Sequence, residues 1–434
     1  MELKKTARID LLKERMLSQP RYVSMEQAMI ITRAYQRHEE EPVILKRAYA
    51  LHDALCELEI GIEPQELIVG NRTKGVRYGV VFPESGISWV DQELETLPTR
   101  PQDKFLVRPE DVQTFREVIK PYWKGKSLED VLKKRYGKEI SALSTVVKIN
   151  QKDHAQGHIC PNVREWLEKG PAGLKEEAQQ HLLDCKEEQR PFYESILLVM
   201  DGVCRFLMRY HDELQKEAKQ HPDWKQDMIE TAEICKALSK RPAETFHEAV
   251  QSMWILFVVL HMESNASSFS PGRLDEILYP YYRKDRELGR LDAQRALDII
   301  ECLWLKFNQI VYLRNKNSAK YFAGFPIGFN IAVGGQDVHG EDVCNELSFL
   351  FLLAQEHIGL PQPNLSVRLH RGTGDALLKK AVRVVAKGSG MPQFFNDEAI
   401  IAELEKLGIS HQDAMDYAIV GCVELTTQGN NLGW

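Results

Sequence analysis

The chain has 434 residues, 43% of them hydrophobic and 27% charged, a composition that supports a large buried core. Its formal net charge of -7 argues against a nucleic-acid-binding protein, because such a protein presents a basic face. No apolar stretch approaches the roughly 18 residues of a membrane span, and the charged start MELKKTARIDLLKERML is no secretory signal, so we expect a cytoplasmic protein outside the membrane.

The eight cysteines are spread along the whole chain. They form no C-x-x-C pair, and their spacing matches no zinc or iron–sulfur framework. We therefore expect reduced thiols and no metal site.

The first 60 residues carry the apolar spacing of packed helices. Ser24 and Gln27 have the Ser-x-x-Gln form of a capping box, which predicts a helix start at this point. Pro42 stands near the start of a second helix, over EPVILKRAYALHDALCEL. The stretch that follows, IEPQELIVGNRT, predicts a short turn into a strand. The N-terminal part is expected to be rich in helix.

Helical patterns continue through the middle of the chain. Residues 106–150 predict helical pieces interrupted at Pro109 and Pro121. Residues 172–262 show the apolar spacing of long packed helices, and TFHEAVQSMWILFVVLHMESN is apolar nearly all round, which indicates a buried helix. A further helix is predicted to open at Asp292, over LDAQRALDIIECLWLKFNQIVYL.

Helix and strand alternate over the last hundred residues. Strands are predicted in FAGFPIGFNIAVGGQD and in PQPNLSVRLH. Helices are predicted over DVCNELSFLFLLAQEHIGL and over GDALLKKAVRVVAKG, which Gly388 ends. We expect MPQFFND to be a loop and YAIVGCVEL to be a buried strand running into a loop. The alternation favours a parallel α/β organisation.

The last predicted strand carries a cysteine and a carboxylate close together. Cys422 and Glu424 are two residues apart, and residues i and i+2 of an extended backbone point to the same side. A thiol and a carboxylate in one cavity can combine sulfur chemistry with proton transfer. The alternative is that Cys422 is a small core residue, the commoner role of a cysteine in an apolar strand.

Other polar segments also allow two interpretations. His158 in GHICPN suits acid–base chemistry, although a surface or capping histidine is the commoner case. The run ESNASSFSPGRLD, residues 263–275, follows a buried helix, so its side chains either face a cavity or form a helix end and turn. Phe325, Phe329 and Asn330 either line a pocket or, as we favour, pack. Because G-x-x-x-x-G-K-[ST], H-E-x-x-H and G-x-S-x-G are absent, nucleotide-binding and hydrolase functions have no support.

Several segments, taken in their order, resemble one enzyme family. They are ESNASSFSPGRLDEILYPYY, LPQPNLSVRLH, GMPQFFNDE and GCVELTTQGNNLGW, and they resemble the glycyl radical enzymes, in the branch of pyruvate formate-lyase and the related dehydratases and lyases. The resemblance runs from the RAYALHDAL region to Trp434. It implies the first half of a ten-stranded α/β barrel with a helix-rich N-terminal part. Residues 1–434 would then form a pyruvate formate-lyase-type domain.

The resemblance also implies a mechanism. In family members, an activating enzyme of the radical S-adenosylmethionine class places a radical on a glycine near the C-terminus, and a cysteine thiyl radical then abstracts hydrogen from a small substrate. Cys422 matches the thiyl cysteine, and Glu424 matches the general base of the G-C-V-E dehydratases and lyases. His158 matches a histidine that helps to protonate a leaving hydroxyl. Ser268 matches a serine that hydrogen-bonds substrate, and Asn265 is a weaker match.

The neighbours of the cysteine indicate the reaction. Pyruvate formate-lyase carries two adjacent cysteines, whereas Gly421 and Val423 flank Cys422 here. Together with Glu424, this implies loss of water or a similar group from a 1,2-diol, an amino alcohol or a hydroxylated ring. The alternatives are formate C-acetyltransferase activity and a non-catalytic remnant or assembly subunit.

One family feature is missing from the sequence. Family members end on an R-V-x-G-[YFW] segment that holds the radical glycine, and no such segment occurs here. We therefore expect the N-terminal half of such an enzyme, truncated before the glycine radical domain, with no bound cofactor of its own and no activity alone. The expected partners are a small substrate, the activating enzyme, a C-terminal half or complementing chain and, in the complete enzyme, a second copy.

Overall fold

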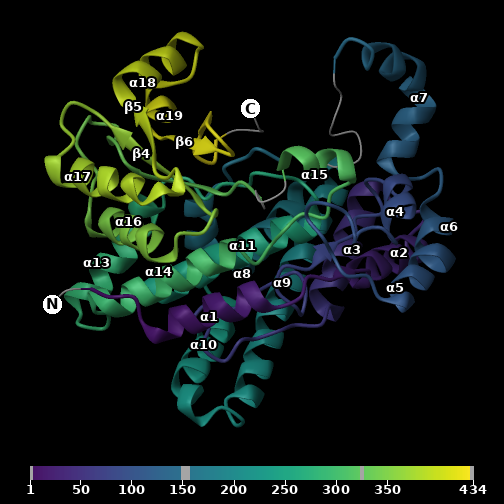
Figure 1. Cartoon of the computed structure of the whole chain (residues 1–434), viewed down its shortest axis with the longest axis horizontal. Helices are drawn as coiled ribbons and strands as arrows, with labels where there is room; N and C mark the ends of the chain where they lie inside the picture. Colours follow the sequence, from purple (N-terminus) through teal and green to yellow (C-terminus); the bar gives the residue numbers. More distant parts are fainter. Residues whose placement is uncertain (1–2, 148–156, 323–326, 431–434) are drawn as a thin grey trace.

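A computed structural model describes residues 3–147, 157–322 and 327–430. Long helices run through its middle, among them α11 (Phe246–Glu263) and α14 (Ala293–Phe307). In Figure 1, helices α2–α7 (residues 26–143) of the N-terminal part lie on one side of the molecule and the C-terminal part, which holds most of the strands, lies on the other. The predicted α/β class with a helix-rich N-terminal part is confirmed.

The N-terminal part is helical, as the sequence predicts. Its helices are α1 (Ala7–Ser18), α2 (Glu26–Arg37), α3 (Val43–Glu57), α4 (Ser88–Glu93), α5 (Pro109–Thr114), α6 (Lys120–Trp123) and α7 (Leu128–Leu143). The capping box predicted at Ser24 is wrong. Ser24 belongs to β1 (Val23–Ser24), which pairs in parallel with β2 (Gly79–Val80), and α2 begins after Met25 without a side-chain cap. Pairing with a segment 56 positions away therefore replaces the local cap.

The strand predicted in IEPQELIVGNRT is also wrong, because this segment is a buried loop. The side-chain amide of Gln251 in α11 accepts a hydrogen bond from Val69 N at 2.8 Å and donates one to Val69 O at 2.7 Å. Trp254 Nε1 donates to Gly70 O at 2.9 Å. Side chains of a buried helix thus satisfy the backbone groups that a neighbouring strand would otherwise bind.

Neither proline in residues 106–150 stops the chain from being helical. Pro109 occupies the first turn of α5, where its missing N–H has no partner to lose. Pro121 follows a π-helical turn, Phe115–Ile119, that links α5 to α6. A π turn changes the hydrogen-bond register, so the helix continues past a residue that cannot donate.

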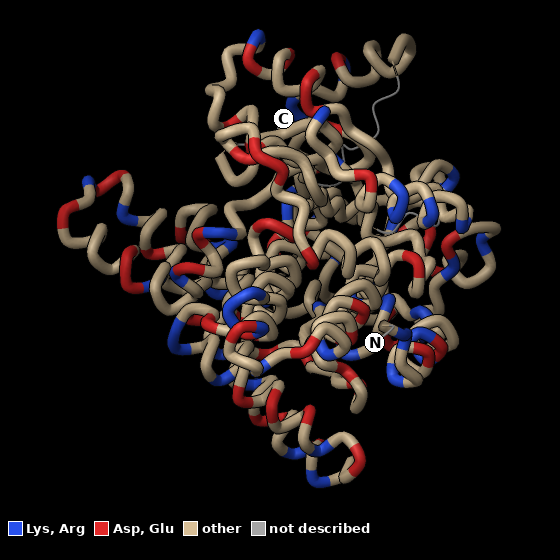
Figure 2. Tube along the Cα trace, turned by 90° about the vertical axis from the view of Figure 1, so that its left-hand side faces the viewer, with Lys and Arg blue, Asp and Glu red and all other residues tan. Residues whose placement is uncertain are grey.

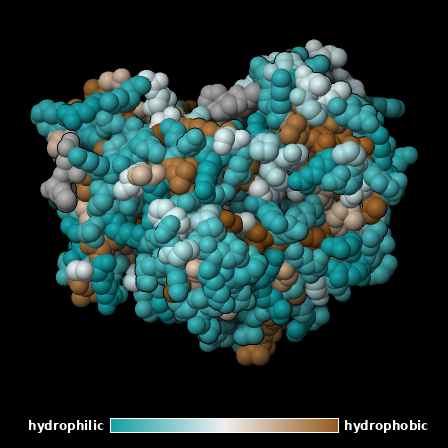
Figure 3. Space-filling view, turned by 60° about the horizontal axis from the view of Figure 1, so that its bottom comes forward, coloured by the Kyte–Doolittle hydropathy of each residue, from teal (hydrophilic) through white to brown (hydrophobic). Residues whose placement is uncertain are grey.

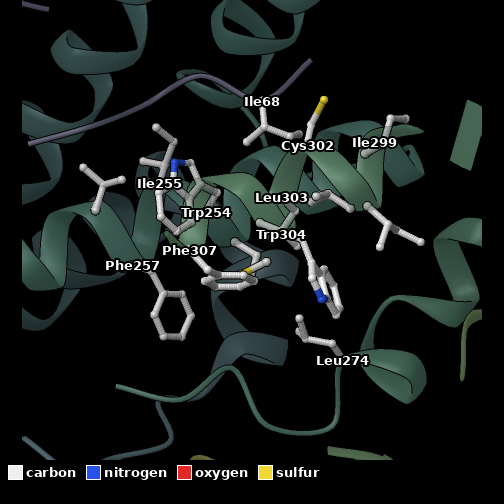
Figure 4. Packing of buried hydrophobic residues seen from close by; sticks show 14 of the residues in the cluster. Ile68, Trp254, Ile255, Phe257, Leu274, Ile299, Cys302, Leu303, Trp304 and Phe307 are labelled. Atoms are coloured by element: carbon white, nitrogen blue, oxygen red, sulfur yellow. The ribbon is translucent and has the colours of Figure 1, made fainter. Parts of the chain in front are cut away.

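The middle of the chain forms the main core. Its helices are α8 (Val163–Asp184), α9 (Arg190–Glu217), α10 (Lys225–Leu238), α11, α12 (Leu274–Ile277), α13 (Tyr279–Glu287) and α14. Trp254 and Phe257 of α11 pack with Trp304 and Phe307 of α14, all fully buried (Figure 4). As predicted, Asp292 caps α14, its side chain accepting a hydrogen bond from Arg295 N at 2.7 Å.

The C-terminal part contains a parallel sheet in the order β3 (Asn330–Gly334), β4 (Asn364–Leu369), β5 (Gln393–Asn396). Its helices are α15 (Lys316–Phe322), α16 (Glu346–Ile358), α17 (Asp375–Val384), α18 (Asp397–Lys406) and α19 (His411–Met415). The loop predicted over MPQFFND is wrong, because Gln393 pairs with Ser366 and starts β5. Gly390 and Pro392 come just before this strand, and such residues are typical of loops, so the local pattern did not indicate a strand.

The chain ends its described part in an antiparallel hairpin of β6 (Tyr417–Val420) and β7 (Glu424–Thr427). The predicted continuous strand over YAIVGCVEL is therefore wrong beyond Val420. Gly421 has φ 59°, a left-handed conformation that turns the chain at this point. Val420 pairs with Glu424 across the three-residue turn.

The surface mixes charge and apolar character. Lys and Arg alternate with Asp and Glu over the trace (Figure 2), and hydrophobic residues form separate patches among hydrophilic ones on the face shown in Figure 3. Within the described ranges, no helix has both the length and the apolar character needed to cross a membrane. All eight cysteines lie in these ranges and are free thiols.

Candidate active site

A cavity of about 440 Å³ lies beside the β6–β7 turn and collects all four predicted site residues. This volume is in the range of small-molecule sites. Its polar lining includes His158, Asn265, Ser268, Gln362, Asn364, Cys422 and Glu424. Residues of α15 and of the segment before it complete the wall. In Figure 1, α15 lies on the side of the molecule toward which β6 points.

The turn holds the thiol and the carboxylate together. Glu424 Oε2 accepts hydrogen bonds from Cys422 N at 2.9 Å and Val423 N at 3.0 Å. The carboxylate therefore folds back beneath the turn, and both residues line one cavity. Partial burial, and next the charge of Glu424, raise the pKa of the Cys422 thiol. Such a cysteine keeps its S–H at neutral pH and is poorly suited to act as a thiolate nucleophile.

The absent side chain of Gly421 marks the centre of the site. A Cβ at this position would lie 3.0 Å from Glu424 Oε2, 3.1 Å from Ser268 Oγ and 3.2 Å from His158 Nε2. His158 Nε2 and Glu424 Oε1 are 3.9 Å apart. A proton acceptor, a hydroxyl and an imidazole thus converge on one small space, the arrangement that proton transfer to and from a bound hydroxyl requires.

His158 and Ser268 are both held in strained backbone. Their φ angles are 60° and 62°, in the left-handed region that residues with a side chain rarely adopt. His158 N donates to Ser267 O at 2.9 Å, and Ser268 N donates to Ile327 O at 3.0 Å. Strain of this kind persists where surrounding structure fixes it, and it concentrates at functional sites. Burial lowers the pKa of His158, and the charge of Glu424 opposes this shift.

The start of the parallel sheet clamps the turn. Asn330 and Asn364 face each other across β3 and β4, and both side-chain amides donate to Gly421 O, at 3.0 and 2.8 Å. Ser270 Oγ accepts a hydrogen bond from Gly421 N at 3.3 Å. The sequence reasoning missed this clamp. Its signal was an asparagine at the first position of both strands.

The other residues considered for the pocket have different positions in the structure. Phe329 is fully buried and its ring lies 4.8 Å from that of Phe307, so it packs in the core, the role we favoured. Phe325 lies outside the described residues. Asn265 lines the cavity, and its Oδ1 is buried with no hydrogen-bond partner in the described part of the chain. A buried acceptor without a partner is costly, and a donor group on a ligand would satisfy it.

A buried ion pair fixes β6 behind the site. Arg368 and Asp397 are fully buried and joined by two hydrogen bonds of 2.9 and 3.0 Å. Arg368 also donates to Tyr417 O and Met415 O, both at 2.9 Å. The Tyr417 hydroxyl donates to Asp397 at 2.8 Å. Because every member is bonded, the network can set the position of β6 and of the turn that follows.

No group of three or more His, Cys, Asp or Glu side chains in residues 3–147, 157–322 and 327–430 is arranged to hold a metal ion. The polar groups that line the described cavity include a thiol, a carboxylate, an imidazole, hydroxyls and amides.

Known proteins are similar to this chain in sequence and in fold. A family described as pyruvate formate lyase-like matches residues 3–434. The chain is 35% identical over 427 residues to the probable dehydratase YbiW of Escherichia coli, covering 94% of this chain and 52% of that protein. The B12-independent glycerol dehydratase from Clostridium butyricum matches with a TM-score of 0.94 and 33% identity, over 99% of this chain and 56% of that one.

A glycyl radical enzyme from Archaeoglobus fulgidus matches with a TM-score of 0.93 and 30% identity, over 98% of this chain and 56% of that one. The chain thus spans about half the length of the curated relatives it matches.

Proposed function

Because this chain belongs to the pyruvate formate lyase-like family, whose members include glycyl radical enzymes, we propose that it carries the reacting thiol and base of a dehydratase or lyase. The reaction removes water or a similar leaving group from a small hydroxylated substrate. The observation that carries the proposal is the convergence of Glu424, Ser268 and His158 on the space beside Gly421, in the cavity that Cys422 also lines.

The proposed fold is the first half of a ten-stranded α/β barrel, with residues 1–434 as its pyruvate formate-lyase-type domain. The parallel order β3–β4–β5 supports this, since β5 is an edge strand among the described residues and Phe394 on it is exposed. An edge strand with an exposed aromatic is suited to pair with a further strand. We assign that strand, and the segment with the radical glycine, to sequence outside these 434 residues.

A glycyl radical, installed by a radical S-adenosylmethionine activating enzyme, would supply the unpaired electron. The residues present fit this role. Cys422 is exposed at the tip of a turn, where another segment can approach its sulfur, and its raised pKa keeps the hydrogen that a radical would remove. A small substrate, the activating enzyme and a polypeptide with the radical glycine are the proposed partners, and assembly as a homodimer stays a prediction.

In the proposed reaction Cys422 would first lose its S–H hydrogen atom to the radical, and its sulfur then takes a hydrogen atom from a substrate carbon and becomes S–H again. Glu424 accepts the proton of the hydroxyl on that carbon. His158, when protonated, gives a proton to the neighbouring hydroxyl, which leaves as water. Cys422 then returns its hydrogen atom to the product. Glu424 Oε1 and His158 Nε2 are 3.9 Å apart, so a single bridging water would let the proton pass from Glu424 to His158 and reset both groups.

Ser268 has a positioning part in this proposal. Its Oγ lies beside the space at Gly421, where it can hydrogen-bond a substrate hydroxyl and orient it between Glu424 and His158. Asn265 Oδ1, buried and without a partner in the described residues, provides a second acceptor for a hydroxylated substrate.

The alternatives are less well supported. Formate C-acetyltransferase activity needs a second cysteine to carry an acyl group, and Gly421 and Val423 occupy both neighbouring positions here. A non-catalytic remnant would have no reason to keep strained backbone at both His158 and Ser268.

The test uses residues 1–434 together with a segment that carries the radical glycine, on one or on two polypeptides, activated without oxygen. Glycyl radical formation is measured by electron paramagnetic resonance, and dehydration products of vicinal diols and amino alcohols are quantified. Cys422→Ser should keep the glycyl signal and lose product. Cys56→Ser, at a cysteine outside the cavity, is the matched control and should keep both. Turnover by Cys422→Ser, or formate production from pyruvate and coenzyme A, would overturn the proposal.

A further inference from the structure

A second cavity, of about 230 Å³, lies next to the reaction cavity. Tyr312, Arg314 and Phe322 line both, so these three residues form the partition between them. The Arg314 guanidinium lies over the ring of Tyr312 at 4.6 Å and over the ring of Phe322 at 4.7 Å. Two aromatic rings thus hold one charged group where it faces both spaces.

The second cavity is built from segments far apart in the sequence. Short parallel bridges join Tyr22 to Leu106 and Gly79 to Val311, and β1 pairs with β2 between them. Arg21, Arg77 and Asp103 come just before these bridged positions, so the fold gathers their side chains at one end of the ladder.

Positive charge is in excess around this cavity. Arg21, Arg77 and Arg314 line it, against the single carboxylate of Asp103. Asp103 is bonded to Arg21 at 2.7 Å, and it also pairs with Arg100 at 3.3 Å. Within residues 3–147, 157–322 and 327–430, Arg77 and Arg314 form no ion pair. Burial lowers the pKa of both, and for Arg77 the charge of Arg21 lowers it further.

Two of these arginines have unsatisfied donors. Arg21 Nε and Arg314 Nη1 are buried and have no hydrogen-bond partner in the described part of the chain. Buried polar groups are almost always paired, and a charged donor without an acceptor is especially costly. An anion in the cavity would offset the surplus charge beside these donors.

The backbone adds an independent observation. Among the described residues, four that are not glycine have positive φ: Arg77, Asp103, His158 and Ser268. His158 and Ser268 line the reaction cavity, and Arg77 and Asp103 line the second one. Strained residues collect where a ligand must be held in a set geometry. In this respect the second cavity resembles the reaction cavity.

We propose that the second cavity is an anion-binding site, separate from the reaction cavity, that takes a small oxyanion such as a phosphate, sulfate or carboxylate. Arg77 and Arg314 supply the free guanidinium groups, and planar guanidinium groups suit the oxygens of such anions. The apolar wall formed by Leu17, Val311 and Leu360 accommodates a short carbon chain on the anion.

The test measures binding of inorganic phosphate to the protein by phosphorus NMR, at constant ionic strength. Arg77→Gln should raise the dissociation constant at least tenfold. Its expected structural cost is small, because within the described residues the one side-chain hydrogen bond of Arg77 is long, 3.5 Å to Met16 O. Arg314→Gln should have a similar effect. Arg108→Gln is the matched control, since that guanidinium lies over Tyr22 at 4.7 Å nearby but does not line the cavity.

Circular dichroism and urea unfolding establish that each variant is folded before it is titrated. Displacement of phosphate by acetate would extend the site to carboxylates, and binding of phosphate without displacement would restrict it to tetrahedral oxyanions. The proposal is overturned if wild-type protein does not bind phosphate, if Arg77→Gln and Arg314→Gln bind it as well as wild type, or if Arg108→Gln weakens binding equally. None of these outcomes depends on turnover in the reaction cavity.

Discussion

Replacing Glu424 by glutamine separates the charge of the carboxylate from its position. The native oxygen accepts the N–H groups of Cys422 and Val423 at 2.9 and 3.0 Å. A glutamine side chain has the same length, and its amide oxygen can accept both. The turn should therefore keep its shape, while the group facing His158 can no longer take a proton.

The structure sets the size of both effects. Hydrogen bonds to charged groups contribute about 1.5–3 kcal/mol and neutral ones about 0.5–1.5 kcal/mol. In Glu424→Gln the two hydrogen bonds from Cys422 N and Val423 N no longer have a charged acceptor. Because the Glu424 side chain is 30% exposed, solvent screens its charge, and we expect the free energy of unfolding to fall by only about 1 kcal/mol. Loss of a positioned proton acceptor should lower kcat by about 10²- to 10⁴-fold.

The assay compares Glu424→Gln with Glu424→Ala, which removes the hydrogen bonds as well as the charge. Both are completed with the radical glycine segment and activated, and kcat is taken from product formation relative to the glycyl radical signal. Urea unfolding gives the stability of each. If Glu424→Gln keeps more than a tenth of wild-type kcat, Glu424 is not the base. If it unfolds as easily as Glu424→Ala, the account of the turn is wrong.

Three further predictions test the scaffold and its pH dependence. Gly421→Ala should lower kcat at least tenfold, whereas Gly359→Ala, at the same φ of 59° but with open space at Cβ, should cost only about 1–2 kcal/mol of stability; equal activity loss in the two would argue against crowding of the site. Arg368→Met leaves Asp397 buried without its partner, so the free energy of unfolding measured in urea should fall by about 3–5 kcal/mol. A fall of less than about 1 kcal/mol would contradict this prediction. Burial raises the pKa of Glu301 from 4.5 to about 8, so the protonated form is favoured in the fold; its contribution to stability is present below pH 4.5 and is lost as pH rises toward 8. Glu301→Gln should flatten this part of the urea-derived stability profile, and an unchanged slope would assign it to other groups.

Local pattern predicted the helices well because they are long and their apolar spacing is local. It failed on short strands. Ser24 and Gln393 belong to strands of two and four residues, whose only stabilising partners lie far along the chain. Such segments have no period to detect, and their flanking Pro, Gly or Ser residues resemble loops and caps. The pairing that decides their conformation is a tertiary property.

The site was predicted from resemblance, and the structure places its four residues in one cavity by a route that the sequence reasoning did not foresee. An extended strand would have put Cys422 and Glu424 on one side through the pleat. Instead the chain turns at Gly421, and the carboxylate caps the N–H groups of the two residues before it. The Glu424 carboxylate can reach the N–H groups of only the one or two residues before it. The turn therefore requires the i, i+2 spacing as much as a strand would. The i, i+2 spacing therefore predicts correctly that the two side chains are close, although the extended backbone assumed for it is wrong. The hydrogen bonds from Cys422 N and Val423 N to Glu424 Oε2 are what distinguish a turn from a strand here.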